Sequence, residues 1–190
     1  DTLFNVTRVR GSNFSDSFVG SDLGTFEEFR PGAGDDFVDG GGGSSDEVRY
    51  SSAATGVTID LSAGAIVTFS DGFGATDTVT NVERIRGSGF RDNLTGDANA
   101  NRLRGDGGDD TLVGNAGADT LDGGSGNDVL DGGSSADSVS GGDGDDTLIG
   151  TFDEAIDTYN GGSGKDVVDY SALAVALAVD LTAQTVGYVF

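Results

Sequence analysis

The chain is dominated by a nine-residue repeat, which constrains its fold more than any other feature. The pattern is Gly, Gly, any residue, Gly, any residue, Asp, any residue, an apolar residue and any residue. Nine units run without a gap from Gly87 to Asp169, and a shorter block of four units runs from Gly11 to Arg49. A fixed short period is typical of stacked repeats, in which no unit can bury its apolar face alone. We therefore expect a solenoid.

The residue types divide each unit into a turn and a strand. The first six positions hold Gly, small polar residues and Asp, which suit a turn because Gly adopts positive φ at little cost. The last three positions form a minimal strand whose single central apolar residue points inward. Two units complete one coil of 18 residues, and neighbouring coils are about 4.8 Å apart. The sequence predicts an all-β fold, a parallel β-roll, with β-hairpin connector or capping segments.

The acidic position of the repeat predicts a stack of carboxylates along each edge of the roll. Residues 18 apart, such as Asp110 and Asp128, would lie above one another in adjacent coils. They repel unless a cation lies between them, and Ca²⁺ accepts the roughly six to eight oxygens that carboxylates and turn carbonyls can supply. We expect roughly five to eight bound calcium ions. The candidate ligands are Asp16, Gly34, Asp36, Asp46, Asp92, Gly108, Asp110, Gly117, Asp119, Gly126, Asp128, Asp137, Gly144, Asp146, Asp157, Gly164 and Asp166.

Composition excludes most other functions. The chain has no His and no Cys, so it has no Ser-His-Asp triad, no thiolate nucleophile and no zinc site of the usual ligands. A net charge of −23 is unsuited to nucleic acid or to anionic membrane surfaces. The longest apolar run, Ala172–Val179, is far shorter than the roughly 20 residues of a membrane span. Because nearly every carboxylate pair falls in the calcium register, we expect no enzymatic activity.

The repeat resembles the nonapeptide calcium-binding repeat of the RTX (repeats-in-toxin) family, also called the haemolysin-type repeat, over residues 11–49 and 87–169. The resemblance implies a parallel β-roll with several bound calcium ions, in a bacterial protein that is secreted by a type I system. It further implies a segment of a large extracellular or cell-surface protein. Such a segment would fold on binding calcium and would act as a structural spacer between neighbouring domains.

A longer repeat defines the organisation of the chain. Residues 1–20 match residues 77–96 at 11 of 20 positions. The predicted segments are the end of a connector (1–10), a short roll block (11–49), a whole connector (50–86), the main roll block (87–169) and the start of a further connector (170–190). In the whole connector, Val57, Ile59 and Leu61 predict one strand and Ile66–Phe69 a second, while Glu83 takes the acidic position of the repeat. We expect this connector to cap one roll and to start the next.

Arginines gather where the main block begins. Arg84, Arg86, Arg91, Arg102 and Arg104 lie close together in the sequence, and Arg8 and Arg10 repeat the first two in the preceding copy. One interpretation is compensation of nearby acidic charge. The other is a strip that docks an anionic polysaccharide, which resembles the sugar-binding RTX modules of secreted alginate-modifying enzymes such as epimerases. A test of polyanion binding would distinguish the two interpretations, because only the second requires such binding.

Overall fold

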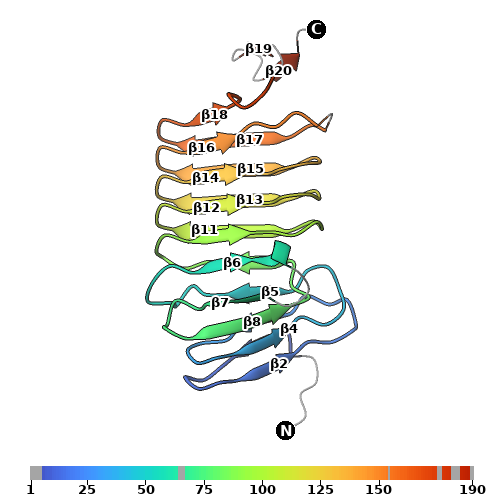
Figure 1. Ribbon diagram of the computed structural model, residues 1–190, viewed down its shortest axis with the longest axis vertical. Coiled ribbons are helices and arrows are strands. Elements are labelled where there is room, and N and C mark those ends of the chain that lie inside the picture. The colour runs from blue at the N-terminus through green and yellow to red at the C-terminus, as the bar shows by residue number, and fades with distance from the viewer. Residues whose placement is uncertain (1–5, 64–66, 154, 175–176, 181–184, 189–190) are drawn as a thin grey trace.

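The computed structural model describes residues 6–63, 67–153, 155–174, 177–180 and 185–188. In these residues the strands stack in a column along the chain, with strands on two opposite sides (Figure 1). Strands of successive coils pair in parallel, as between β10 and β12 or between β13 and β15. The one helical turn in the described part is the 3-10 turn η1 (Leu61–Ala63). The predicted all-β parallel roll is confirmed.

One side of the roll is a single eight-stranded sheet, which we call the long sheet. Its strands, in spatial order, are β1 (Arg8–Arg10), β3 (Glu28–Arg30), β5 (Glu47–Arg49), β9 (Arg84–Arg86), β11 (Arg102–Gly107), β13 (Thr120–Ser125), β15 (Ser138–Asp143) and β17 (Thr158–Ser163). Leu103 pairs with Leu121, and Leu121 pairs with Val139. These partners are two units apart, so the predicted coil of two units is confirmed.

The other side of the roll is divided between two sheets. The first half-sheet contains, in spatial order, β2 (Ser17–Val19), β4 (Phe37–Asp39), β8 (Thr76–Thr80) and β7 (Val67–Ser70). The second half-sheet contains β6 (Thr58–Asp60), β10 (Asn93–Thr95), β12 (Thr111–Val113), β14 (Val129–Asp131), β16 (Thr147–Ile149) and β18 (Val167–Asp169). Near the C-terminus, β19 (Leu177–Asp180) and β20 (Thr185–Tyr188) form an antiparallel hairpin.

The connector contains both strands that its sequence predicts. β6 surrounds Ile59 and pairs in parallel with β10 of the main block. β7 overlaps the second predicted strand, and it forms an antiparallel hairpin with β8. Residue 66, where we placed the start of this second strand, lies outside the described residues.

The connector continues one side of the roll and lies between two separate sheets on the other side. β5 of the short block pairs directly with β9, and β9 pairs with β11 of the main block. β8 likewise pairs with β4. The connector therefore continues the long sheet between the blocks, whereas on the other side β7 ends the first half-sheet and β6 begins the second, as a segment that caps one roll and starts the next would do. The physical reason is that Asp77-Thr78-Val79 and Glu83-Arg84-Ile85 keep the acid, any residue, apolar pattern of the repeat, so they supply strands in register.

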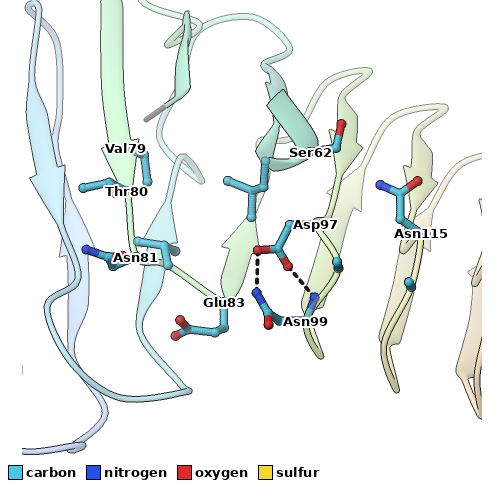
Figure 2. A pocket seen from close by; sticks show the side chains of 12 residues that line it. Ser62, Val79, Thr80, Asn81, Glu83, Asp97, Asn99 and Asn115 are labelled. Carbon is cyan, nitrogen blue, oxygen red and sulfur yellow. Dashed lines mark hydrogen bonds between the residues drawn. The ribbon is translucent and has the colours of Figure 1, made fainter. Parts of the chain in front are cut away.

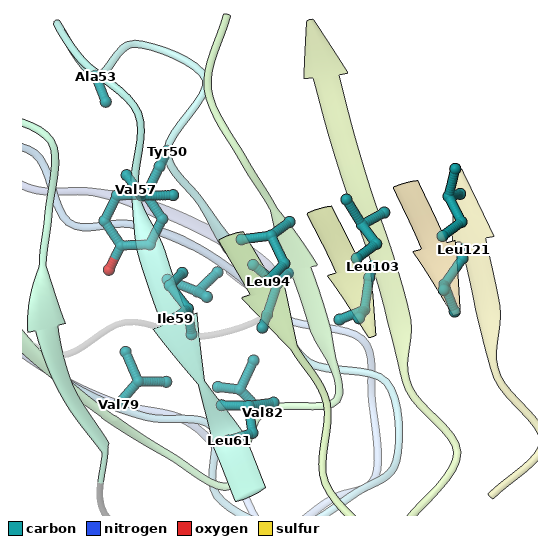
Figure 3. Packing of buried hydrophobic residues seen from close by; sticks show 14 of the residues in the cluster. Tyr50, Ala53, Val57, Ile59, Leu61, Val79, Val82, Leu94, Leu103 and Leu121 are labelled. Carbon is teal, nitrogen blue, oxygen red and sulfur yellow. The ribbon is translucent and has the colours of Figure 1, made fainter. Parts of the chain in front are cut away.

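A column of single apolar side chains fills the space between the sheets. The apolar residues of the repeat from Leu94 to Leu148 are each at most 1% exposed. Tyr50, Ile59 and Val79 of the connector belong to the same cluster (Figure 3). Val168 is 39% exposed, because its strand β18 is the last of its sheet and lacks a neighbour on one side among the described strands.

The turns show why the repeat needs glycine at its second and fourth positions. At the fourth position, Gly108 and Gly126 have φ of 112° and 129°. At the second position, Gly124 has φ of 114°, and Asp106 adopts the same region with φ of 76°.

We predicted three-residue strands, but β11, β13, β15 and β17 have six residues. They are longer because residues of the predicted turns also pair, as Asp106 does with Gly124.

Candidate metal centre

Hydrogen bonds join the acidic residues of successive coils along both edges of the roll. The backbone N–H of one acidic residue donates to Oδ1 of the acidic residue one coil further on. On the edge that precedes the second half-sheet, Asp110 N–H donates to Asp128 and Asp128 N–H donates to Asp146, each at 2.8 Å. On the edge that precedes the long sheet, Asp119 N–H donates to Asp137 at 2.8 Å. The predicted stacking is confirmed, and the protein itself occupies one oxygen of each of these carboxylates.

The second carboxylate oxygen is left without a partner. At seven of the predicted ligands, Oδ2 is buried and accepts no hydrogen bond: Asp36, Asp46, Asp110, Asp119, Asp128, Asp137 and Asp146. None of these residues is more than 4% exposed. An ionised oxygen that is buried without a partner is strongly destabilising, whereas a bound cation would satisfy it.

A backbone carbonyl oxygen lies close to four of these free oxygens, those of Asp110, Asp119, Asp128 and Asp146. A Cβ added to Gly105, the first residue of its unit, would collide with Asp110 Oδ2 and with the carbonyl oxygen of Gly123 in the next coil. A Cβ on Gly123 would collide in the same way with Asp128 Oδ2 and the carbonyl oxygen of Gly141. The first glycine is therefore required by close approach. The free carboxylate oxygen and the nearby carbonyl oxygen together form a cradle of acceptors that suits a cation.

The glycines predicted as ligands lie in the turns of both edges. Gly34, Gly108, Gly117, Gly126, Gly144 and Gly164 all have positive φ. Gly126, Gly144 and Gly164 each lie against the carbonyl oxygen of the glycine one coil before. These carbonyls form a second row of oxygens along the edge, two residues before the acidic positions.

Burial is the largest cause of raised pKa values in the acidic stacks, and neighbouring carboxylates add to it. The pKa is raised to about 8 for Asp110, to about 7 for Asp119 and to about 6 for Asp128 and Asp137. The backbone N–H that each carboxylate accepts lowers the pKa and offsets only part of this effect. A cation at the free oxygen would favour the ionised form.

Four predicted ligands differ from the other acidic residues. Asp92 Oδ2 accepts the N–H of Ser88 at 2.6 Å, and Asp16 Oδ2 accepts a serine N–H in the same way. Asp157 Oδ2 accepts two hydroxyl groups, each at 3.0 Å. Asp166 is only half-buried at the end of its edge. The geometry offers no buried free oxygen at these positions, so they are weaker candidates than the seven above.

The connector contributes acidic residues that the sequence analysis did not select as ligands. Asp77 Oδ1 accepts the N–H of Asp36 at 2.9 Å, and Glu83 accepts the N–H of Asp46 at 3.1 Å, so both continue the edges. The sequence Asp77-Thr78-Val79 has the acid, any residue, apolar pattern of the repeat, so it could have identified Asp77 as a candidate ligand. Asp71, in the turn between β7 and β8, also has a buried Oδ2 without a partner, and no repeat pattern marks it.

The donor set fits calcium. In the acidic stacks the free side-chain atoms are all carboxylate oxygens, which Ca²⁺ prefers and softer metals do not. Among the residues that the structure describes, no three acidic side chains are close enough to hold a metal by themselves. Each ion would therefore be held by one or two carboxylates together with turn carbonyls.

A cavity of about 560 Å³ lies where the first half-sheet gives way to the second. Figure 2 shows polar side chains from the connector and the repeat turns around it, among them Glu83, Asp97 and Asn99. Asp97 accepts two hydrogen bonds from Asn99, each at 2.8 Å. The free carboxylate oxygens described above belong to other residues, so this cavity is separate from the candidate metal positions.

Comparison with known proteins identifies the repeat. A model of the RTX calcium-binding nonapeptide repeat matches the chain in four copies, at residues 32–45, 80–112, 113–148 and 131–168. No curated protein matches the chain. Within the described ranges, none of the helical structure is long and apolar enough to cross a membrane.

Proposed function

Because the chain belongs to the family of RTX calcium-binding nonapeptide repeats, we propose that it is a segment of a larger secreted bacterial protein that folds when it binds calcium. In this proposal it serves as a structural spacer that separates or displays neighbouring domains. The repeats are a structural calcium-binding module and not a catalytic one, so any catalysis would belong to other parts of the protein.

The observation that carries this proposal is the row of buried carboxylate oxygens without partners. The proposed ligands are the side chains of Asp36, Asp46, Asp110, Asp119, Asp128, Asp137 and Asp146, together with carbonyls of the edge turns. Each of these residues adds a buried carboxylate oxygen without a partner, so a cation shared between neighbouring coils would stabilise them.

Calcium-coupled folding accounts for a role outside the cell. An ion that binds only the native state stabilises it by mass action. At low cytosolic calcium the acidic chain would stay unfolded, as export through a type I channel requires. At the higher calcium concentration outside the cell it would fold.

Far-UV circular dichroism during a calcium titration of the chelator-treated chain tests the proposal. We expect a cooperative transition from coil to β-structure, on the order of 10⁻⁴ to 10⁻³ M calcium for an extracellular site. Magnesium at the same concentration should fail, since it prefers a smaller octahedral site. At about pH 8, where the carboxylates are ionised, a chain that is fully folded in chelator, or folded equally well by magnesium, would contradict the proposal.

The variant Asp128→Asn tests the assigned ligands directly. Asn keeps an oxygen that can accept the N–H of Asp110, but it removes the charge at the free oxygen. We expect the calcium midpoint to rise. Asp109→Asn is the matched control, because Asp109 is exposed and also accepts a backbone N–H one coil away, from Asn127. Equal midpoints for the two variants would show that Asp128 is no ligand.

The alternative function, a polysaccharide-binding module of a secreted enzyme, depends on different residues. It requires a cationic surface, and the calcium edges provide none. The arginines of the long sheet are the one group of basic side chains in the described residues large enough to form such a surface.

A further inference from the structure

The two ends of the chain each match one part of the internal connector and its surroundings. Residues 170–183, which we call the tail, match residues 50–63 at 6 of 14 positions. Residues 1–20, which we call the head, match residues 77–96 at 11 of 20 positions. Within the chain, the segments 50–63 and 77–96 lie against each other and share hydrogen bonds. The tail of one copy and the head of another therefore carry the two sides of the same interface.

The internal interface consists of two strand pairs and two further hydrogen bonds. β5, which directly precedes the connector, pairs in parallel with β9, and β6 pairs in parallel with β10. The N–H of Tyr50 donates to the carbonyl oxygen of Arg86 at 2.9 Å. The N–H of Val57 donates to Asp92 Oδ1 at 2.7 Å. The central residues of the joined strands are buried as a result, among them Val48, Ile85 and Leu94.

The matching strands at the two ends of the roll lack these partners. β1 and β2 match β9 and β10 in sequence position, and β18 matches β5. Each of the three ends its sheet, with a neighbour on one side only in the described part of the chain. Val168 is 39% exposed, and Val9 and Phe18 are only half-buried. Asp16 matches Asp92, and none of the described residues donates to its Oδ1.

The tail contains the strand that the head lacks. β19 matches β6 and pairs antiparallel with β20, and its other edge has no strand beside it in the described ranges. The turn before it is also preserved: the N–H of Leu173 donates to the carbonyl oxygen of Tyr170 at 3.0 Å, as the N–H of Ala53 does to that of Tyr50 at 2.8 Å. β2 and β18 lie at opposite ends of the roll (Figure 1), so the two sides of this interface meet between copies.

We propose that copies of this chain associate head to tail, with β18 and β19 of one copy pairing in parallel with β1 and β2 of the next. In the internal interface, Arg49 pairs with Arg86. The same register places Asp169 of one copy beside Arg10 of the next. Arg10 is exposed, forms no ion pair in the described residues and has Arg30 as its strand neighbour, so an acidic partner is favourable there.

The contact joins two different surfaces, which determines the form of the assembly. Each added copy leaves one head and one tail free, so the assembly is linear and open. A strand that ends a sheet is a template for pairing with another chain. The inference rests on the proposed calcium-dependent folding, because the end strands must form first. Without calcium, two copies that each carry −23 repel each other, and bound ions reduce this repulsion.

Sedimentation velocity of the full chain at saturating calcium, over a range of protein concentrations, tests this inference. We expect the average mass to grow with concentration beyond that of a dimer. Arg10→Glu should weaken the association roughly two- to thirtyfold, because it replaces one exposed ion pair with a like-charge contact. The double variant Arg10→Glu/Asp169→Arg restores opposite charges and should recover the association. The matched control is Arg102→Glu, because Arg102 is also exposed on the long sheet but lies in the inner strand β11.

Disulfide cross-linking tests the register. The chain has no Cys, and paired residues on strands about 4.8 Å apart fall within the Cα separation of roughly 4.4–6.8 Å that a disulfide spans. Under mild oxidation, Arg10→Cys/Asp169→Cys should form a ladder of linked multimers. Arg102→Cys/Asp169→Cys should form little, because its two positions do not meet in this register.

Circular dichroism of each variant in calcium separates loss of association from loss of folding. Growth with concentration that Arg10→Glu weakens and the double variant recovers supports the inference. A chain that folds in calcium but stays monomeric overturns it and leaves the calcium proposal intact. An assembly that stops at a dimer, or that Arg102→Glu weakens equally, also overturns it. A chain that stays unfolded in calcium contradicts both proposals.

Discussion

Protons should replace calcium in stabilising this roll. In the calcium-free fold, burial first and neighbouring carboxylates next raise the pKa of Asp110 from 3.8 to about 8 and that of Asp119 to about 7. In the unfolded chain the same groups ionise near pH 4. As the pH rises from about 4 to about 8, the unfolded chain releases protons that the folded chain retains. The free energy of unfolding therefore falls with rising pH, and it is largest in acid.

The size of this change in the free energy of unfolding follows from the same pKa values. One pH unit of pKa change corresponds to about 1.4 kcal/mol. The increase from 3.8 to about 6 at Asp128 destabilises the calcium-free fold at neutral pH by about 3 kcal/mol. The larger increase at Asp110 costs about 4 kcal/mol at neutral pH, where the folded group is still mostly protonated, and about 6 kcal/mol once the pH exceeds its raised pKa. Stacked groups titrate together, so these costs do not add independently. Two or three of them still match the roughly 5–15 kcal/mol of net stability of a whole domain.

Far-UV circular dichroism of the chelator-treated chain, measured from about pH 8 to about pH 5, checks this prediction. We expect a disordered spectrum at the upper end and β-structure at the lower end, without calcium. Asp110→Asn should extend the calcium-free β-structure to higher pH, because the amide has no charge to bury. The surface variant Asp109→Asn should leave the transition unchanged. A chain that loses β-structure as the pH falls through this range would refute the reasoning.

Two further predictions concern packing. Gly123→Ala should destabilise the roll by about 1–3 kcal/mol and raise its calcium midpoint, because the added methyl group displaces a carboxylate and a carbonyl oxygen. The control is Gly89→Ala, since the space around an added Cβ is open there. In the same calcium titration this control should change neither the stability nor the calcium midpoint. Leu121→Ala should cost about 2–5 kcal/mol in urea unfolding with calcium present, since this side chain is fully buried in the core column. Val168→Ala, at an exposed end of that column, should cost much less, and equal losses would argue against a continuous core.

The repeat made most of the fold predictable. A period of nine residues with one apolar position left little choice except a coil of two units, and the partners of Leu112 are the leucines 18 residues before and after it. The positions of these acidic residues were predictable to the same extent, since seven of the Asp residues predicted as ligands have a buried free oxygen. The units of Asp16 and Asp92 already differ in the pattern, because Phe14 and Phe90 replace the glycine at the fourth position. The structure adds that a serine N–H donates to each of these two carboxylates.

By itself, the sequence determined the strand period, the inward position of each apolar residue and the stacking of acidic residues, because all three follow from local pattern and the constant spacing of β-strands. Tertiary structure alone decided how the connector joins the two blocks, since the pairing of β5 with β9 spans a segment without the nonapeptide repeat. It also decided that arginines from three segments form one row. Such long-range neighbours depend on which strands pair, and the repeat leaves that choice open wherever it is interrupted.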